Sequence, residues 1–236
     1  MKIKAVLFDL YGTLVGFEPS RFLIQSQVAS KYGLNLSEDG VSKGYFFADK
    51  FMSEQNSIDP IRSMSLVDKN NFFGKYEQLV LSGDGYEVDI KLCKKIFQEL
   101  QKIPYSMILY PDVIPMLIRL KESHYKLGLI SNMDRIGDEL LKEFELNEYI
   151  DVCITSKEAN AEKPDPIIFN LALKKLGIES KESIYIGDQI LSDIEGARNA
   201  GMNSMLIDRE GSHINYDHEK ISTLSELLDL LITQNN

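Results

Sequence analysis

Several side chains with the chemistry of hydrolytic enzymes follow short apolar segments of the chain. Asp9 ends the segment IKAVLFD, and Asp188 ends the segment SIYIGD. A carboxylate can attack carbon or phosphorus and be regenerated by water, which divides one difficult reaction into two easier steps. The other polar side chains that follow such segments are Tyr11, Thr13, Ser131, Asn132, Lys163 and Asp193. This set of residue types could form one hydrolytic site if the fold brings its members together.

The elements around these residues predict that they do meet. From about residue 111 the chain alternates between β-prone segments and segments with apolar residues at helical spacing, which is typical of a parallel sheet with helices on both faces. The expected strands are residues 3–9, 125–131, 151–156, 183–188 and 203–208, and the expected helices are residues 113–124, 134–146, 164–177, 190–201 and 223–233. A single aspartate after a strand is more often a helix N-cap or a turn residue. Ligands of open α/β sheets bind beyond the carboxyl ends of the strands, so polar side chains at four strand ends favour a common site.

A long segment after the first strand has a different character. Residues 20–33 and 89–103 have apolar residues at helical spacing, and little of the surrounding sequence resembles a strand. We therefore predict an α/β fold with two domains. Residues 1–15 and 105–236 form the parallel-sheet core, and residues 16–104 form an inserted helical domain.

Composition excludes several classes of protein. The chain has 236 residues, 26 Lys and Arg, 36 Asp and Glu, and a formal net charge of -10, so it has no general attraction for nucleic acid or an anionic membrane. No segment approaches the ~20 apolar residues of a membrane helix. Cys93 and Cys153 lie 60 positions apart in apolar stretches and show neither a metal-binding spacing nor a disulfide framework. We expect a cytoplasmic protein that acts on a small, anionic molecule; the sequence indicates no oligomeric state.

Four motifs resemble those of the haloacid dehalogenase-like (HAD) hydrolase superfamily. They are FDLYGTL at 8–14, SN at 131–132, KPDPIIF at 163–169 and GDQILSD at 187–193, and they occur in the superfamily's order. The helical insertion between the first two motifs is similar to the helical cap of subfamily I. The resemblance implies a Rossmann-like core with an inserted cap.

The resemblance also implies roles for individual residues. Asp9 would be the nucleophile that forms a covalent ester intermediate, and Lys163 would neutralise charge on Asp9 and on that intermediate. Ser131 or Asn132 would bind oxygens of the transferred group or hold the nucleophile. Lys157 lies near Lys163 in the sequence, but we expect it to be a solvated lysine.

A divalent cation belongs to the same implied site. Asp188 would bind it together with Asp9 and the backbone carbonyl of Tyr11, and Mg²⁺ suits such oxygen ligands. Asp193 would bind the ion through water or orient the site. Tyr11 and Thr13 would contact substrate.

Tyr11 divides two interpretations of the chemistry. Phosphatases of the superfamily carry an aspartate at this position, which protonates the leaving alcohol, whereas D-x-Y-G-T is similar to the first motif of the 2-haloacid dehalogenases, which need no acid. The fourth motif, and Phe169 in the third motif, are instead similar to the corresponding motifs of the superfamily's phosphatases. Arg21 and Arg62 are the only arginines of the predicted cap, and neither lies in a recognisable halide-binding context.

Electrostatics favours the phosphatase. If the carboxylates of Asp9 and Asp188 lie about 4 Å apart, they repel by roughly 4 kcal/mol at an effective dielectric constant near 20, so one of them would tend to protonate. A bound cation removes this repulsion and stabilises phosphoryl transfer. We therefore expect a Mg²⁺-dependent phosphatase of a small phosphorylated metabolite. The alternatives are a 2-haloacid dehalogenase-like hydrolase that uses the same nucleophile, and a non-catalytic binding or scaffold protein.

Overall fold

The computed structural model of the chain describes residues 2–213 and 216–235. The chain divides into two compact units, one formed by residues 1–16 and 108–236 and the other by residues 17–107. We call them the α/β unit and the helical unit and describe each by itself. No helix among the described residues has both the length and the apolar character needed to cross a membrane.

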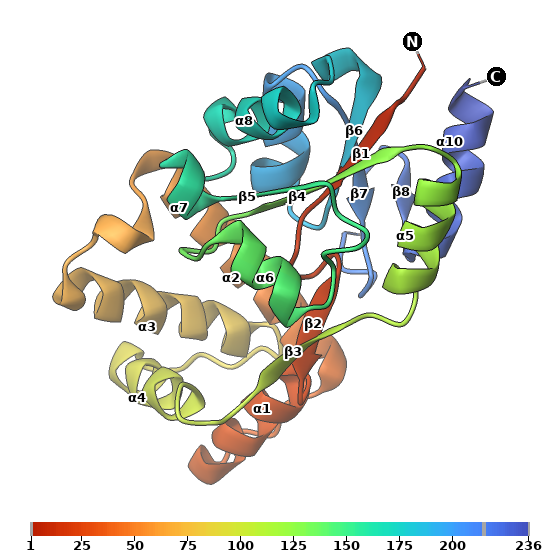
Figure 1. The fold of residues 1–236 in the computed structure, drawn as a ribbon. Coiled ribbons are helices and arrows are strands. Elements are labelled where there is room, and N and C mark those ends of the chain that lie inside the picture. The colour runs from red at the N-terminus through yellow and green to blue at the C-terminus, as the bar shows by residue number, and fades with distance from the viewer. Residues whose placement is uncertain (1, 214–215, 236) are drawn as a thin grey trace. The chain divides into compact units, whose positions relative to one another are not determined.

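The α/β unit is built on a sheet of six parallel strands in the order β5-β4-β1-β6-β7-β8 (Figure 1). The strands are β1 (Ala5–Phe8), β4 (Lys126–Ser131), β5 (Val152–Thr155), β6 (Ser183–Gly187), β7 (Asn203–Ile207) and β8 (Lys220–Ile221). Every residue of β1 is fully buried, as expected for a central strand covered on both faces. The predicted Rossmann-like sheet flanked by helices is therefore confirmed.

Helices cover both faces of this sheet. They are α5 (Val113–Glu122), α6 (Gly137–Glu143), α7 (Ser156–Ala159), α8 (Pro166–Leu176), α9 (Gly196–Asn199) and α10 (Leu227–Asn235), with single 3₁₀ turns at Ser180–Glu182 and Leu224–Glu226. On one face, Ala5 and Leu7 of β1 and Tyr185 of β6 pack in one apolar cluster with α8 and α9. α5 packs against α10, and both lie on the opposite side of the sheet from α8 (Figure 1).

Two expected helices differ from the observed ones. The helix expected at 134–146 begins only at Gly137, because side chains that follow β5 hold the preceding segment as a loop: Thr155 donates a 2.6 Å hydrogen bond to the carbonyl of Arg135, and Ser156 donates one to that of Met133. The helix expected at 190–201 is a π-helical turn, Ile190–Glu195, followed by α9. Strand β8 was not predicted.

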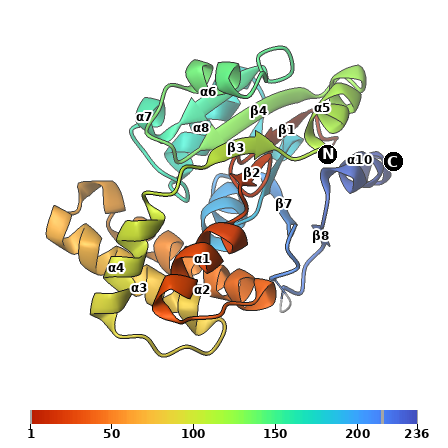
Figure 2. The same ribbon diagram turned by 90° about the horizontal axis from the view of Figure 1, so that it is seen from below.

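The helical unit consists of four helices that pack against one another (Figure 2). They are α1 (Arg21–Ala29), α2 (Glu38–Ile58), α3 (Leu66–Ser82) and α4 (Ile90–Leu100), with 3₁₀ turns at Ser30–Tyr32 and Ile61–Ser63. Each helix begins at a side chain that accepts a backbone N–H of its first turn, as N-cap residues do; these are Ser20, Ser37, Ser65 and Asp89. Gly44 allows α2 to approach α3 closely, because a Cβ there would collide with the backbone of Val80.

A polar cluster is buried inside the helical unit. Arg21 forms an ion pair with Asp49 at 2.6 Å, and Asp49 also accepts a hydrogen bond from Tyr76 at 2.5 Å. Beside them, the side-chain amide of Gln25 donates to the carboxyl group of Glu77, and both residues are buried. We refer to these five residues as the cap cluster.

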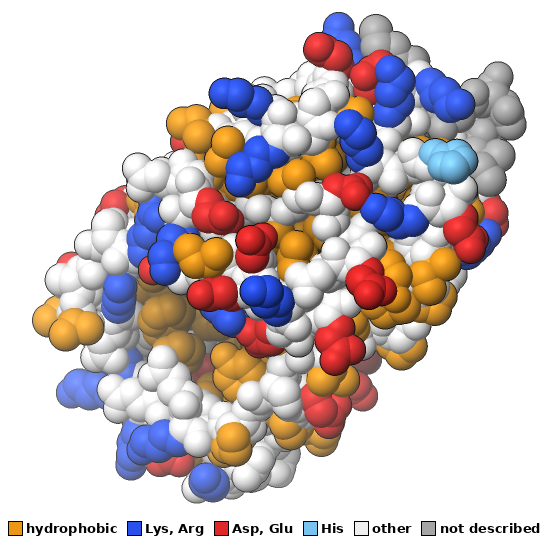
Figure 3. Space-filling model, viewed as in Figure 1, with side chains coloured by type: hydrophobic (Ala, Val, Ile, Leu, Met, Phe, Trp, Pro, Cys, Tyr) orange, Lys and Arg blue, Asp and Glu red, His pale blue; other side chains and the backbone are white. Residues whose placement is uncertain are grey.

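Two short strands lie where the chain passes between the units. β2 (Val15–Glu18) and β3 (Ser106–Leu109) form a separate two-stranded sheet, and neither was predicted. Figure 3 shows acidic and basic side chains interspersed on the face of the protein in that view.

Candidate active site

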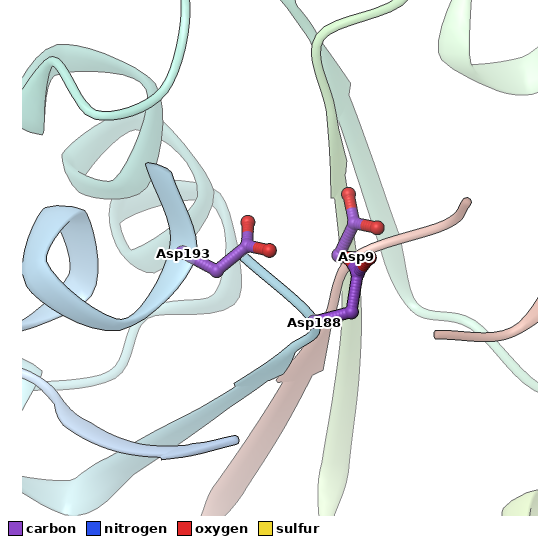
Figure 4. A group of neighbouring side chains, drawn as sticks. All are labelled: Asp9, Asp188 and Asp193. Atoms are coloured by element: carbon purple, nitrogen blue, oxygen red, sulfur yellow. The ribbon is translucent and has the colours of Figure 1, made fainter. Parts of the chain in front are cut away.

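Three aspartates meet beyond the carboxyl ends of the central strands. Asp9 directly follows β1, Asp188 directly follows β6, and Asp193 lies in the π-helical turn (Figure 4). Each offers a carboxylate oxygen, and the three oxygens lie within 4.8 Å of one another. Asp9 and Asp193 are 7% and 1% exposed, so their charges are largely removed from water. A site of this kind needs positive charge close by.

Lys163 supplies part of that charge. The side chain is 3% exposed, and its ammonium group donates to Asp9 Oδ1 at 2.5 Å and to Asp193 Oδ1 at 2.6 Å. It also donates to the phenol oxygen of Tyr185 at 3.0 Å. Lys157, by contrast, is exposed on α7.

Asn132 holds the main chain of Lys163. Its Oδ1 accepts the Lys163 N–H at 2.7 Å, and its Nδ2 donates to the Lys163 carbonyl at 3.0 Å. This pair of hydrogen bonds fixes the loop that carries the lysine. The neighbouring Ser131 ends β4 and is buried beside it.

Burial and charge shift the acid–base behaviour of the site. Burial raises the pKa of Asp9 to about 6; the lysine opposes this shift and Asp193 adds to it. Burial alone would lower the pKa of Lys163, but the carboxylates of Asp193 and Asp9 outweigh it and hold that pKa well above 10.5. The lysine is therefore charged at neutral pH. A cation beside Asp9 would lower the pKa of its carboxyl group.

The turn after the nucleophile candidate is tightly bonded. Gly12 donates its N–H to the carbonyl of Val15 at 2.8 Å and has a φ of +78°, and a Cβ at this position would collide with the carboxylate of Asp188. Arg209, which follows β7, donates from Nε and Nη2 to the carbonyl of Thr13 at 3.0 and 2.8 Å. The side chain of Thr13 is buried, and its Oγ1 has no hydrogen-bond partner among the described residues.

The same Arg209 is anchored on its other side. Its guanidinium group forms two 3.1 Å hydrogen bonds with the carboxylate of Asp112 and lies 4.0 Å from the ring centre of Tyr110. A guanidinium group that binds a carboxylate through two parallel hydrogen bonds is well oriented. Arg209 thus fixes the backbone four residues after Asp9.

The π-helical turn directs Asp193 toward the lysine. The Oδ2 atom of Asp193 accepts the backbone N–H of Gln189 at 2.9 Å, and the Oδ1 atom of Asp193 accepts an N–H of the Lys163 ammonium group. A Cβ at position 187 would collide with the Asp193 side chain, so Gly187 is required there. The Gln189 side chain donates to Asp188 Oδ2 at 3.0 Å.

The fold thus brings together most of the side chains singled out in the sequence. Asp9, Lys163 and Asp193 are in direct contact, and Asp188 joins them at the sheet edge. The sequence analysis did not identify Tyr185, Gln189 or Arg209. The one usable signal was the phenol in the apolar strand SIYIGD, because a buried tyrosine hydroxyl requires a polar partner.

The side chains fit a divalent cation. Carboxylate oxygens are the ligands that Mg²⁺ prefers, and this cluster brings three carboxylates within 4.8 Å of one another, two of them in ion pairs with Lys163. Both oxygens of Asp193 already accept hydrogen bonds, so Asp9 and Asp188 are the side chains best suited to direct coordination.

The chain is similar in sequence to known proteins. Residues 6–207 match the haloacid dehalogenase-like hydrolases. The chain is 29% identical over 214 residues to a glyceraldehyde 3-phosphate phosphatase of Methanopyrus kandleri, covering 88% of this chain and 84% of the relative. It is 26% identical over 236 residues to (S)-2-haloacid dehalogenase 4A of Burkholderia cepacia, covering 97% and 95%.

A solved structure agrees with the sequence relatives. The fold is similar to that of a HAD phosphatase from Thermococcus onnurineus, with a TM-score of 0.59 and 30% identity over 98% of both chains. Because the family match extends over most of the chain and includes all four motifs, the chain belongs to the haloacid dehalogenase-like hydrolase family.

Proposed function

We propose that the protein is a Mg²⁺-dependent phosphatase of a small phosphorylated metabolite, with Asp9 as its nucleophile. The observation that carries the proposal is the cluster of three carboxylates, two of them paired with the buried Lys163, because clustered carboxylates suit a divalent cation and an anionic phosphate approaches more readily once their charge is neutralised. Relatives named glyceraldehyde 3-phosphate phosphatase support it.

The reaction proceeds in two steps. A carboxylate oxygen of Asp9 attacks phosphorus, the bond between phosphorus and the leaving oxygen breaks, and an aspartyl phosphate forms on Asp9. Water then attacks this intermediate, inorganic phosphate leaves and the carboxylate is restored. Lys163 stays charged throughout and stabilises the negative charge that develops at Asp9 and the phosphoryl group.

The other residues position these groups. Asp9, Asp188 and the backbone carbonyl of Tyr11 would hold Mg²⁺, with Asp193 as a supporting residue. The ion neutralises the site and the phosphoryl oxygens when bound. Ser131 and Thr13 contact the transferred group, and Asn132 acts through its two hydrogen bonds to the Lys163 main chain.

The two compact units have separate proposed roles. The α/β unit carries the catalytic groups, and the helical unit is the cap that selects the substrate. The free thiols of Cys93 and Cys153 are buried, and burial raises their pKa values to about 11 and about 12, so both are unreactive. Free thiols without disulfides are typical of proteins of the cytoplasm.

The direct test is an assay of the purified protein with glyceraldehyde 3-phosphate, with an alkyl phosphate and with p-nitrophenyl phosphate, each with and without Mg²⁺. Release of phosphate that requires Mg²⁺ supports the proposal. If no phosphate ester is hydrolysed under any condition, the proposal is wrong.

A second candidate function is hydrolysis of a 2-haloacid. Tyr11 favours it, because this position holds no carboxylate to protonate a leaving alcohol, and so does the similarity to (S)-2-haloacid dehalogenase 4A. Halide release from L-2-chloropropionate in the presence of EDTA would support it. A protein that turns over neither substrate class would instead have a binding role.

The variant Tyr11→Asp separates the two reactions. In a phosphatase the new carboxyl group can protonate poor leaving groups, so turnover of the alkyl phosphate should rise roughly 10-fold while p-nitrophenyl phosphate changes much less. In a dehalogenase the added negative charge should abolish halide release. If alkyl phosphate turnover stays flat and aryl phosphate turnover collapses, Tyr11 does not occupy an empty acid position.

A further inference from the structure

Tyr185 lies directly beneath the ammonium group of Lys163 and is fully buried in the middle of β6. Its hydroxyl oxygen accepts an N–H of Lys163 at 3.0 Å and donates to the carbonyl of Ile130 at 3.2 Å. Ile130 belongs to β4, and β1 lies between β4 and β6 in the sheet. The phenol therefore links β6, which leads to Asp188, with β4, which leads to Ser131, on either side of β1.

The two hydrogen bonds give the hydroxyl a fixed orientation. A phenol has one hydrogen to donate, and the Ile130 carbonyl takes it, so a lone pair faces the lysine. Burial raises the pKa of Tyr185 well above 10, so the hydroxyl keeps its proton. The ring is held from the side by Phe169 of α8, edge to face at a centroid distance of 5.1 Å.

The ammonium group of Lys163 has three hydrogens and donates to three partners, namely Asp9, Asp193 and Tyr185. The two carboxylates attract the ammonium group electrostatically, whereas the phenol is neutral and has a fixed position. With one N–H directed to the phenol, the other two are aimed at the carboxylates. Without the phenol, the ammonium group could rotate and withdraw from the nucleophile.

We propose that Tyr185 is a positioning residue that acts through Lys163. Its hydroxyl group holds the ammonium group within hydrogen-bond distance of Asp9 and Asp193. The inference deepens the proposed function, since it rests on the role given to Lys163. It means that the reaction requires the hydroxyl group of Tyr185 and not only its aromatic ring. A merely structural Tyr185 would contribute packing and stability only.

The test compares Tyr185→Phe with Tyr76→Phe. Each substitution removes one buried hydroxyl that binds a charged partner, Lys163 in one case and Asp49 in the other. For p-nitrophenyl phosphate we expect Tyr185→Phe to lower kcat about 5- to 30-fold with KM within twofold, because one oriented hydrogen bond is lost from a group that acts in the transition state. Tyr76→Phe should leave kcat within twofold.

The effect of Tyr185→Phe in a Lys163→Arg variant shows whether Tyr185 positions the lysine or only packs in the core. If Tyr185 acts through the lysine, the Tyr185→Phe effect on kcat should shrink to about twofold or less in that background. A loss that persists undiminished, or a kcat for Tyr185→Phe that equals that of Tyr76→Phe, would overturn the inference.

A second readout does not depend on catalysis. Urea unfolding of Tyr185→Phe, Lys163→Met and the double variant gives the coupling between the two side chains, and we expect their effects on the unfolding equilibrium constant to deviate from additivity by at least about fivefold. Additive effects would contradict the inference. If the parent protein hydrolyses no phosphate ester, the proposed function fails, and this cycle still decides whether the phenol and the lysine act together.

Discussion

The two units of the protein each bury charged side chains, but they balance the charges differently. In the cap cluster one guanidinium group meets one carboxylate, Arg21 with Asp49, and the neighbouring Glu77 stays neutral because burial raises its pKa to about 8. At the sheet edge of the α/β unit, three carboxylates lie within 4.8 Å of one another, and Lys163 forms ion pairs with two of them, Asp9 and Asp193. The first cluster pairs one cation with one carboxylate, whereas the second brings several carboxylates close together.

This difference separates stabilising polar groups from functional ones. A balanced buried pair leaves nothing for a ligand to neutralise, and removing either partner mainly costs stability. A cluster of several carboxylates destabilises the folded protein unless a cation binds, and clustering of this kind is typical of functional sites. Variants should therefore affect stability most in the cap cluster and activity most at the sheet edge.

The largest expected effect is that of Asp9→Asn. An amide is a poor nucleophile, so kcat should fall by at least about 1,000-fold for every substrate that the parent turns over. The melting temperature should stay close to that of the parent, because the loss of the ion pair with Lys163 is offset by the loss of the repulsion between Asp9 and Asp193. Asp49→Asn in the cap cluster is the matched control and should lower the melting temperature instead. Turnover by Asp9→Asn within tenfold of the parent would remove Asp9 from the nucleophile role.

Removal of the buried cation from each cluster sharpens the comparison. Lys163→Met should lower kcat/KM about 100-fold or more, because the transition state loses an oriented positive charge. Arg21→Met should lower the free energy of unfolding by about 2 kcal/mol, since it leaves Asp49 buried without its partner, and kcat/KM should change less than about tenfold. Steady-state kinetics and urea unfolding of both variants measure the two quantities. Equal loss of activity in the two variants would refute the distinction.

Divalent cations should act on one cluster only. EDTA should abolish activity and Mg²⁺ should restore it. Mg²⁺ at about 100 times its Kd should stabilise the folded protein by about 2.7 kcal/mol, because it binds only the native state. Asp188→Asn should weaken both effects, whereas Asp49→Asn should leave the Mg²⁺-dependent stabilisation unchanged. Full activity in EDTA would contradict the metal site.

The smallest effect concerns the protonation of Glu77. Its pKa is about 8 in the folded protein against 4.5 for an exposed glutamate, so between these values the unfolded chain ionises and the folded chain does not. The contribution of Glu77 to stability therefore declines as pH rises from about 4.5 to about 8. Glu77→Gln should flatten this decline in urea unfolding between pH 5 and 9 and raise stability at pH 9. A decline that is as steep in Glu77→Gln as in the parent would show that other groups cause it.

The amino-acid sequence predicts the convergence at the sheet edge because strand ends and turn residues are local signals. Asp9 and Asp188 each end an apolar segment, and a parallel sheet brings such ends together. The partners of a side chain are not local. Nothing in the sequence indicates that Asn132 clamps the main chain of Lys163, or that Arg209 reaches a carbonyl 196 positions away.

Secondary structure is likewise predictable where its signals are local in the sequence. Residues 16–104 were predicted as mostly helical because residues 20–33 and 89–103 have apolar residues at helical spacing and little of the rest resembles a strand, and the helical unit contains four helices. The π-helical turn at 190–195 has the same apolar spacing as an α-helix, so the spacing does not distinguish them, and it does not reveal the contacts of Asp193 with Lys163 and the Gln189 backbone. β2 and β3 are too short to show a pattern and depend on each other for pairing.

The strand order has a consequence for how the protein is made. β1 is synthesised first, but its two neighbours, β4 and β6, begin at residues 126 and 183. All four helices of the helical unit are synthesised before either neighbour, so β1 has no strand to pair with in the sheet while they are being made. The buried apolar face of β1 therefore needs protection during synthesis. Asp9, near the start of the chain, gains its partners in the site only after Lys163, Asp188 and Asp193 have been translated.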